Sequence, residues 1–582
     1  MIKRFAGCIR EYKKNAILSP VFVTFEVLIE CLIPLIMASL IDNGIEPGSK
    51  SIILKLGFSL LGMALFSLVF GALAGRSAAI AAAGFAKNLR SDMFKKVQGF
   101  SFSSIDRFST ASIVTRLTTD VTNIQNAFMM IIRVAVRSPV MLIFSLVMAF
   151  EINKRLSLIF LGAIPVLAVG LYIIIFYAHP IFEKVFKTYD KLNNVVQENL
   201  RGIRVVKSFV REDYEKEKFG SVSNEIYAHF SKAQKIVAFN MPLMQAVVYV
   251  CMLLISWFGA KIIVGSGSTE LTTGGLTGLI TYMMQMLISL MMLSMVFVMI
   301  IISRASAKRV TELLSEETDL RNPENPIYEV GDGSVSFRNV SFGYGKKGDK
   351  LCLFDINLDI KSGETVGIIG GTGSSKSTLV SLIPRLYDVA EGSVSVGGAD
   401  VRRYDMETLR NSVSVVLQKN ELFSGTIRDN LRWGNEDATD DEMEYVCRLA
   451  QADGFIREMP GGYDTYIEQG GTNVSGGQKQ RLCIARALLK KPKILILDDS
   501  TSAVDTRTDA QIRKSLSDFM PETTKFIITQ RISSVMDADK IIVLESGRIS
   551  ETGTHEELMK KSRIYREVYE SQQKGGSENE AE

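Results

Sequence analysis

Thr365-Val-Gly-Ile-Ile-Gly-Gly-Thr-Gly-Ser-Ser-Lys-Ser-Thr378 is the most informative stretch of the sequence. It begins as a short apolar run typical of a buried strand, passes through glycines and serines, and leads into an apolar segment typical of a helix. Backbone N–H groups and a helix N-terminus in this order surround phosphate groups. The spacing predicts a phosphate loop in which Lys376 reaches the terminal phosphates and the Ser377 hydroxyl binds Mg²⁺. The residues expected around the phosphates are Gly370, Gly371, Thr372, Gly373, Ser374, Ser375, Lys376, Ser377 and Thr378.

One position of this loop departs from the usual pattern. Ser375 stands directly before the lysine, where the phosphate-loop pattern has glycine. If this position takes a positive φ, a side chain costs about 1–2 kcal/mol. Because serine is small, we expect nucleotide binding to survive in a weakened form.

Two segments further along the chain carry related chemistry. Lys493-Ile-Leu-Ile-Leu-Asp-Asp499 has the composition of a buried parallel strand and ends in two carboxylates. Asp498 fits the acidic residue that holds Mg²⁺ in phosphate-loop NTPases. Val474-Ser-Gly-Gly-Gln-Lys-Gln-Arg481 opens a helix at Ser475, a natural N-cap, yet two glycines in a first turn disfavour a helix. Their presence indicates that backbone approaches a second phosphate.

The first half of the chain differs in kind, because it contains six long apolar segments. About 20 helical residues cross the hydrocarbon core of about 30 Å, and soluble proteins rarely need so many apolar helices of that length. The six predicted spans are residues 17–40, 56–75, 126–150, 156–180, 236–260 and 276–302. The fold class is therefore a membrane α-helical domain, six transmembrane helices with long cytoplasmic extensions, fused to an α/β P-loop NTPase domain.

The charge is divided between these halves. The net charge of 67 − 63 = +4 is the sum of 33 − 22 = +11 over residues 1–320 and 34 − 41 = −7 over residues 321–582. The basic loops are the long ones, so both termini and the second half are expected in the cytoplasm. The three histidines lie far apart in sequence, which argues against a histidine-built centre. We expect an interfacial helix over 1–14, a transmembrane domain over 15–320, a linker over 321–333, a nucleotide-binding domain over 334–571 and a disordered acidic tail over 572–582.

The phosphate loop, the Ser-Gly-Gly-Gln segment and the acidic strand, in this order, resemble those of the ATP-binding cassette (ABC) transporters. The resemblance covers nearly the whole chain, and Gly202-Ile-Arg-Val-Val-Lys-Ser-Phe209 is similar to a segment of the B-type (multidrug/lipid) exporter half-transporters. It implies ATP and Mg²⁺ as cofactors and two cassettes that dimerise head to tail, each ATP lying between one phosphate loop and the other chain's signature. It further implies roles for Tyr344 (adenine stacking), Gln418 (Mg²⁺ and the attacking water), Ser475, Gly476, Gly477 and Gln478 (signature), and Ser502-Ala-Val-Asp505 (the loop coupling the two sites).

Two departures from the family touch catalysis. Asp499 stands where the family has its general-base glutamate, and its shorter side chain reaches less far toward an attacking water. Gln530 stands where the family has a histidine that contacts the γ-phosphate. Together with Ser375, they predict that this chain's own site is degenerate while its signature completes a working site on a different chain. A homodimeric exporter with slow turnover is the alternative.

The resemblance thus implies a translocase subunit of a heterodimeric exporter of hydrophobic or amphipathic compounds, such as multidrug or lipid-like molecules. The plasma (inner) membrane of a bacterium is the expected location, and the expected partners are a second half-transporter with intact Glu and His, the lipid bilayer and the exported compound, without nucleic acid. A regulatory or sensor subunit that only binds ATP is a second possibility. Charges within the spans are costly and mark substrate-path candidates or mutual pairs: Glu26, Glu30, Arg133 and Arg137.

Overall fold

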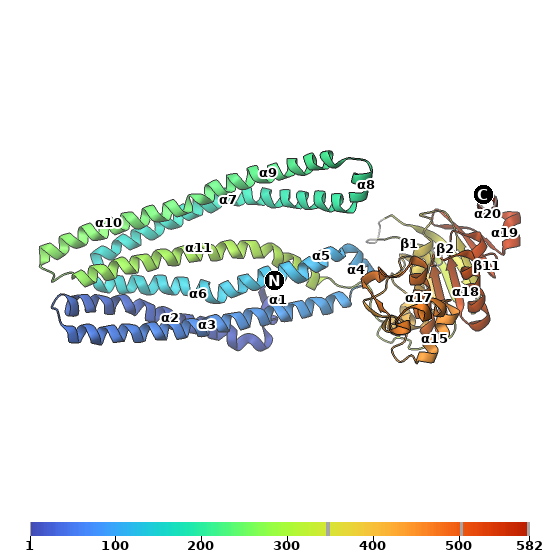
Figure 1. The fold of residues 1–582 in the computed structure, drawn as a ribbon, viewed down its shortest axis with the longest axis horizontal. Coiled ribbons are helices and arrows are strands. Elements are labelled where there is room, and N and C mark those ends of the chain that lie inside the picture. The colour runs from blue at the N-terminus through green and yellow to red at the C-terminus, as the bar shows by residue number, and fades with distance from the viewer. Residues whose placement is uncertain (1, 345–349, 501–503, 579–582) are drawn as a thin grey trace. The chain divides into compact units, whose positions relative to one another are not determined.

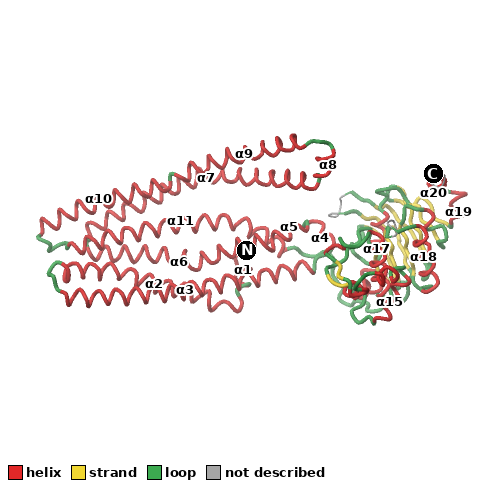
Figure 2. Tube along the Cα trace, viewed as in Figure 1, coloured by secondary structure: helices red, strands yellow, loops and turns green. Residues whose placement is uncertain are grey.

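The computed structural model describes residues 2–344, 350–500 and 504–578, and these separate into two compact units. The helical unit comprises Met1–Gln98 and Thr110–Ser315, and the α/β unit comprises Gly99–Ser109 and Glu316–Glu582. In the described chain every strand belongs to the α/β unit, as the colours of Figure 2 show.

The helical unit contains six helical segments long and apolar enough to cross a membrane, which confirms the predicted number of spans. Its helices are α1 (Ile2–Gly7), α2 (Lys13–Leu40), α3 (Lys50–Gln98), α5 (Thr110–Thr115), α6 (Val121–Ile152), α7 (Lys154–Arg201), α8 (Ile203–Ser208), α9 (Glu212–Ala238), α10 (Asn240–Ser266) and α11 (Thr273–Ser315) (Figure 1). At 1.5 Å per residue, the 49 residues of α3 extend well beyond a hydrocarbon core of about 30 Å.

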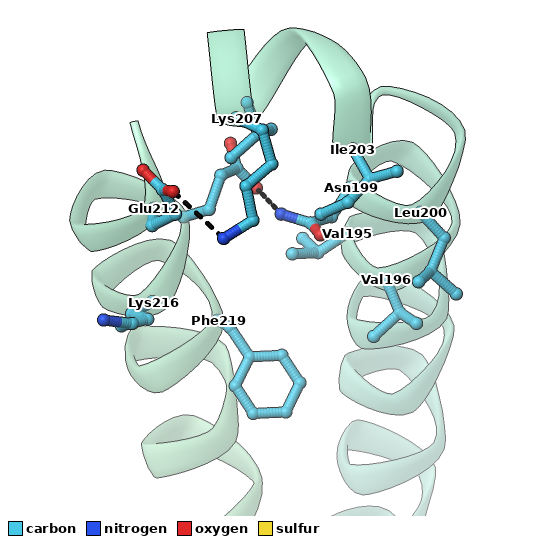
Figure 3. A pocket seen from close by; sticks show the side chains of 11 residues that line it. Val195, Val196, Asn199, Leu200, Ile203, Lys207, Glu212, Lys216 and Phe219 are labelled. Carbon is cyan, nitrogen blue, oxygen red and sulfur yellow. Dashed lines mark hydrogen bonds and ion pairs between the residues drawn. The ribbon is translucent and has the colours of Figure 1, made fainter. Parts of the chain in front are cut away.

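The helices α7 and α9 form a long hairpin whose end is closed by α8. Lys207 Nζ donates to Glu212 Oε1 at 3.1 Å, and Asn199 Nδ2 donates to Glu215 Oε2 at 3.1 Å (Figure 3). A cavity of about 300 Å³ lies between the two arms here. Just beyond α8, Phe209 and Val210 are 72% and 80% exposed, so the end of the hairpin presents exposed apolar side chains.

The α/β unit is built on a six-stranded sheet in the order β12-β11-β3-β10-β9-β6, parallel except for β12. Its strands are β3 (Thr365–Ile369), β6 (Val413–Val416), β9 (Ile494–Asp498), β10 (Thr524–Ile528), β11 (Lys540–Glu545) and β12 (Arg548–Gly553). A four-stranded antiparallel sheet contains β2 (Leu353–Ile360), β1 (Val335–Phe342), β4 (Glu391–Val396) and β5 (Ala399–Asp400), and a small one pairs β7 (Gly425–Thr426) with β8 (Tyr466–Ile467).

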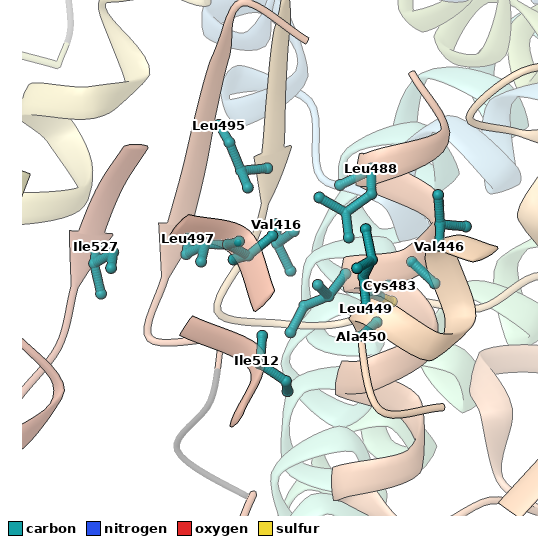
Figure 4. Close-up of a cluster of buried hydrophobic side chains, with 14 of the residues drawn as sticks. Val416, Val446, Leu449, Ala450, Cys483, Leu488, Leu495, Leu497, Ile512 and Ile527 are labelled. Carbon is teal, nitrogen blue, oxygen red and sulfur yellow. The ribbon is translucent and has the colours of Figure 1, made fainter. Parts of the chain in front are cut away.

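The described part of the α/β unit also contains α-helices. They are α4 (Phe102–Arg107), α12 (Lys376–Ser381), α13 (Met406–Ser412), α14 (Ile427–Arg432), α15 (Asp440–Leu449), α16 (Asp453–Glu458), α17 (Gly476–Leu489), α18 (Thr506–Phe519), α19 (His555–Lys561) and α20 (Arg563–Glu578). One core cluster joins Leu488 of α17 and Val446 of α15 to Leu495 and Leu497 of β9 (Figure 4). The all-buried pattern of β9 is typical of a parallel strand covered on both faces.

The end of the chain differs from the expected boundary. The acidic tail was expected from residue 572, yet α20 continues to Glu578. Tyr565 of α20 is completely buried in the core, with Val568 and Tyr569 packed against it, and this anchorage carries the helix past residue 572. Residues 579–582 of the expected tail lie outside the described residues.

Candidate functional site: a phosphate loop and its carboxylates

A cavity of about 310 Å³ lies at the carboxyl ends of β3, β9 and β10. In an open parallel sheet this edge is where ligands bind, because loops and helix N-termini converge there. The described residues that line it are Thr372, Gly373, Ser374, Ser375, Lys376, Ser377, Thr378, Gln418, Asp498, Asp499, Ile528, Thr529 and Gln530. The cavity thus brings together residues of four stretches of the chain, 372–378, 418, 498–499 and 528–530.

The phosphate loop has the backbone that its sequence predicts. Gly373 has φ of 81° and Ser375 has φ of 70°, so the serine does occupy a left-handed conformation. Gly370 approaches the neighbouring strand closely, since a Cβ there would lie 2.2 Å from the carbonyl oxygen of Leu544. Lys376 opens α12 and donates from Nζ to the carbonyl oxygen of Gly370 at 2.8 Å, which holds the ammonium inside the loop.

Two acidic side chains face this lysine. Burial lowers the pKa of Lys376, and the charges of Asp498 and Asp499 oppose that shift. Burial is also the main cause that raises the pKa of Asp498, while a hydrogen bond from Ser377 lowers it. A carboxylate beside a hydroxyl is a hard-oxygen donor pair of the kind that Mg²⁺ prefers. The residues present therefore fit a magnesium ion held between Ser377 and Asp498.

Asp499 and Gln530 meet because the strands that precede them are parallel neighbours. Asp498 of β9 pairs with Ile528 of β10, and the N–H of Asp499 donates to the Ile528 carbonyl at 2.9 Å. Asp499 has φ of 47°, and its Oδ2 accepts from Gln418 Nε2 at 3.4 Å. The two residues that depart from the family and the glutamine expected to sense the ion therefore line one cavity.

Tyr344 stands beside this cavity. Its hydroxyl lies 2.9 Å from Oγ1 of Thr378, and its ring is 50% exposed. The ring packs edge-on against Tyr387 at a centroid distance of 5.2 Å. A fixed, half-exposed ring next to the phosphate loop is a suitable stacking surface for a base.

The signature segment contributes no residue to this cavity within the described chain. Ser475 caps α17 in a reciprocal pair: its Oγ accepts from the N–H of Gln478 at 3.3 Å, and Gln478 Oε1 accepts from the N–H of Ser475 at 2.9 Å. The capping pair explains how a helix begins on two glycines, Gly476 and Gly477. The helix N-terminus remains available for an anion.

The coupling loop is only partly described. Ser502 and Ala503 lie outside the described residues. Asp505 caps α18 by accepting from the N–H of Thr508 at 2.9 Å, and this backbone hydrogen bond is the main cause that lowers the pKa of Asp505.

The charges in the membrane spans are brought together as a cluster. Arg137 of α6 donates to Glu26 at 2.5 Å and to Glu30 at 2.7 Å, both on α2. Glu26 is 7% exposed and lies against Gly71, where a Cβ would come within 3.0 Å of its Oε1. Arg133 lies apart, next to Gly75. Mutual pairing, one of the two roles considered for these residues, is therefore found for three of the four.

Several functional contacts carry no local sequence signal. Tyr387 donates to Asp106 of the segment Gly99–Ser109, and Gln572 of α20 contacts the backbone at Gln530. Thr529 lines the cavity, and only its place between β10 and Gln530 could have indicated it.

Six membrane-spanning helices and an α/β domain with a phosphate loop, in one chain, define a membrane-bound P-loop ATPase. Two family models match: "ABC transporter transmembrane region" over residues 16–290 and "ABC transporter" over residues 353–502. The chain belongs to the ABC transporter family. It is a half-transporter in composition: one multi-pass transmembrane region and one ATP-binding domain in a single chain.

Individual relatives cover much of the chain. An uncharacterized ABC transporter ATP-binding protein, YfiB of Bacillus subtilis, is 36% identical over 97% of both chains. The ATP-dependent lipid A-core flippase of Desulfotalea psychrophila is 34% identical over 84% of each. The probable multidrug resistance ABC transporter ATP-binding/permease protein YheI of B. subtilis is 34% identical over 74% of this chain and 72% of its own. A bacterial Atm1-family ABC exporter with ATP bound has the same fold, with a TM-score of 0.82, 24% identity, and coverage of 97% of this chain and 98% of that chain.

Proposed function

We propose that this chain is the subunit of a heterodimeric ATP-driven exporter whose own phosphate site is degenerate. The observation that carries the proposal is the placement of Asp499 and Gln530 in one cavity with Lys376. A general base must reach the attacking water, and aspartate is one methylene shorter than the glutamate it replaces. A loss of a hundredfold to ten-thousandfold in turnover corresponds to about 2.7–5.4 kcal/mol of barrier.

In this proposal the chain's residues bind ATP rather than cleave it efficiently. Lys376 and the loop N–H groups bind the phosphates, Tyr344 stacks on the base, and Ser377, Gln418 and Asp498 hold Mg²⁺. The ion would neutralise charge on the phosphate oxygens. Ser475 and its helix N-terminus complete the site of the partner chain, which carries Glu and His at the corresponding positions.

Two substitutions that should have unequal effects on the ATP turnover of the assembled heterodimer test this proposal. Asp499→Asn should leave the turnover of the assembled heterodimer nearly unchanged, whereas Ser475→Ala should reduce it strongly, because only the signature serves the hydrolytic site. The purified chain alone should turn over ATP slowly. Equal loss from both substitutions would favour a homodimer, and rapid turnover by the chain alone would overturn the proposal.

We further propose that the exported compounds are hydrophobic or amphipathic, and the similarity to the lipid A-core flippase and to the probable multidrug resistance transporter supports this. The bacterial plasma membrane, with both termini in the cytoplasm, is the proposed location.

The apolar end of the α7–α9 hairpin, with Phe209 and Val210 exposed, is a surface suited to contact with the partner subunit. Export of a dye by cells with and without the partner separates an exporter from an ATP-binding sensor.

The charged residues of the spans are proposed to border the substrate path. The Glu26, Glu30 and Arg137 cluster has two carboxylates and one guanidinium, so it carries an excess negative charge that would attract cationic amphiphiles. Glu26→Gln with Glu30→Gln should reduce export of cationic dyes and spare neutral ones. Unchanged export of cationic dyes would mean that these three residues only form ion pairs with one another and do not bind the exported compound.

A further inference from the structure

The side-chain amide of Gln572 forms two hydrogen bonds with the backbone that carries Gln530. Its Nε2 donates to the carbonyl oxygen of Gln530 at 2.6 Å, and its Oε1 accepts from the N–H of Ile532 at 2.9 Å. One donor and one acceptor of the amide thus engage residues i and i+2 of the turn that follows β10. The pairing fixes the orientation of the amide, since exchanging its oxygen and nitrogen would oppose two acceptors and two donors.

Gln572 is held in place by the anchorage of its helix. Tyr565 of α20 is completely buried, and its hydroxyl lies 2.7 Å from Nδ1 of His555. On the other side, Ile532 is also completely buried, so the segment that Gln572 contacts has a fixed end in the core. The amide therefore connects two anchored elements, α20 and the turn after β10.

Gln530 lies between this connection and the nucleotide cavity. Its side chain lines the cavity together with Lys376 and Asp499. Residue 530 itself is exposed, whereas Thr529 before it and Ile532 after it are buried. A side chain contributes most to binding when its backbone is already held in the productive position.

We propose that Gln572 is a positioning residue for the nucleotide site, which sets where Gln530 presents its amide to the terminal phosphate of ATP. The inference rests on the proposed function in one respect, the binding of ATP in the cavity that Gln530 lines; the contact of Gln530 with the terminal phosphate is part of the inference. ADP lacks the terminal phosphate, so Gln572 should affect the affinity for ATP and leave that for ADP unaltered.

The test compares Gln572 with its neighbour Gln573, which is also on α20, also exposed, and donates instead to the hydroxyl of Tyr569 at 3.2 Å. Gln572→Glu keeps an acceptor for Ile532 and places a second oxygen against the Gln530 carbonyl, while Gln572→Ala removes both contacts. Gln573→Glu and Gln573→Ala make the same chemical changes without altering a contact to the turn after β10. Dissociation constants for ATP and ADP are measured with the purified full chain in Mg²⁺.

We expect the preference for ATP over ADP to fall by about three- to tenfold in both Gln572 variants, the size expected for one modest hydrogen bond. The Gln573 variants should keep the preference of the wild type. Equal weakening of ATP and ADP, or an unchanged preference, would overturn the inference, because a merely structural role of α20 would lower stability and not nucleotide discrimination. The isosteric Gln572→Glu keeps the test valid if the alanine variant fails to fold.

Gln530→Ala tests separately whether Gln530 contacts the terminal phosphate of ATP. If it lowers the preference for ATP, then adding Gln572→Ala should have no further effect, since both act through one side chain. A preference lowered by Gln530→Ala but not by Gln572→Glu overturns the positioning role alone. A preference that neither variant alters removes the proposed phosphate contact as well.

Discussion

The hydroxyl of Tyr387 donates to Oδ2 of Asp106 at 2.7 Å, within the α/β unit. Burial, with the charge of Asp106 beside it, raises the pKa of Tyr387, so the phenol stays protonated and able to donate. The same ring packs edge-on against Tyr344, whose hydroxyl lies near Thr378 of the phosphate-loop helix. A continuous series of contacts thus links the segment before α5 to the nucleotide cavity.

Tyr387→Phe should weaken this link without removing the ring. A hydrogen bond to a charged group contributes about 1.5–3 kcal/mol, and exposure places this one at the low end. We expect a loss of about tenfold in the stimulation of ATPase activity by exported compound, with ATP affinity within about twofold of wild type because the ring contact with Tyr344 remains. Asp106→Ala should match it, and a full response in both variants would exclude a coupling role.

Restoring the family residues should restore catalysis. In Asp499→Glu with Gln530→His, the carboxylate regains its reach and the imidazole its charge. We expect the ATPase rate of the purified chain alone to rise by at least about tenfold, within the range for one positioned acid–base group. Gln418→Ala in the same background serves as the control and should remove the gain. An unchanged ATPase rate in the double variant would mean that residues other than Asp499 and Gln530 limit hydrolysis at this site.

Ser375→Gly should strengthen nucleotide binding. The serine has φ of 70°, a conformation that glycine adopts without strain. We expect ATP affinity to rise by about three- to tenfold, corresponding to about 1 kcal/mol, in equilibrium binding. Ser375→Val should do the opposite, because a β-branched side chain is disfavoured at positive φ. Equal affinity in all three proteins would show that the loop conformation does not limit binding.

Acidification should weaken Mg²⁺-dependent ATP binding at a higher pH than an ordinary aspartate would allow. Burial raises the pKa of Asp498 above 3.8, so its ionised form is disfavoured in the folded chain. A carboxyl whose pKa is raised on folding favours the folded state at low pH and loses that contribution as the pH rises through the folded pKa. As the pH decreases toward the folded pKa of Asp498, the free energy of unfolding of the nucleotide-free protein should therefore rise. Over the same pH range the Mg²⁺-dependent affinity for ATP should fall. Asp498→Asn should abolish this pH dependence both of stability, measured by thermal unfolding, and of ATP affinity, measured by nucleotide titration.

Arg137→Gln should destabilise the helical unit. The substitution leaves Glu26 and Glu30 within the membrane without their shared guanidinium. Removing one partner of a fully buried ion pair costs about 3–5 kcal/mol; because Arg137 is 32% exposed, we expect a smaller loss, seen as a lower midpoint of thermal unfolding in detergent. Arg155→Gln, outside the predicted spans, is the matched control. A midpoint equal to that of the control would mean that the cluster does not stabilise the fold.

Contiguous sequence determined much of this protein. The strand, loop and helix around Lys376 and the six spans depend on local hydrogen bonding and on apolar length, so their patterns are visible within about 20 residues. The positive φ of Ser375 was likewise foreseeable, since the loop pattern has glycine there. The sequence also indicated that Glu26, Glu30 and Arg137 need counter-ions, but not which helix supplies them.

Tertiary structure alone decided which distant residues meet. Asp499 and Gln530 share a cavity because β9 and β10 are parallel neighbours, and Gln572 contacts Gln530 because Tyr565 anchors α20 in the core. The sequence predicted that residue 572 lies in a disordered tail, because the short polar run around it does not indicate that Tyr565 anchors its helix in the core. Such contacts depend on sheet order and on packing between elements, which no local pattern contains, whereas the motifs depend on neighbours along the chain.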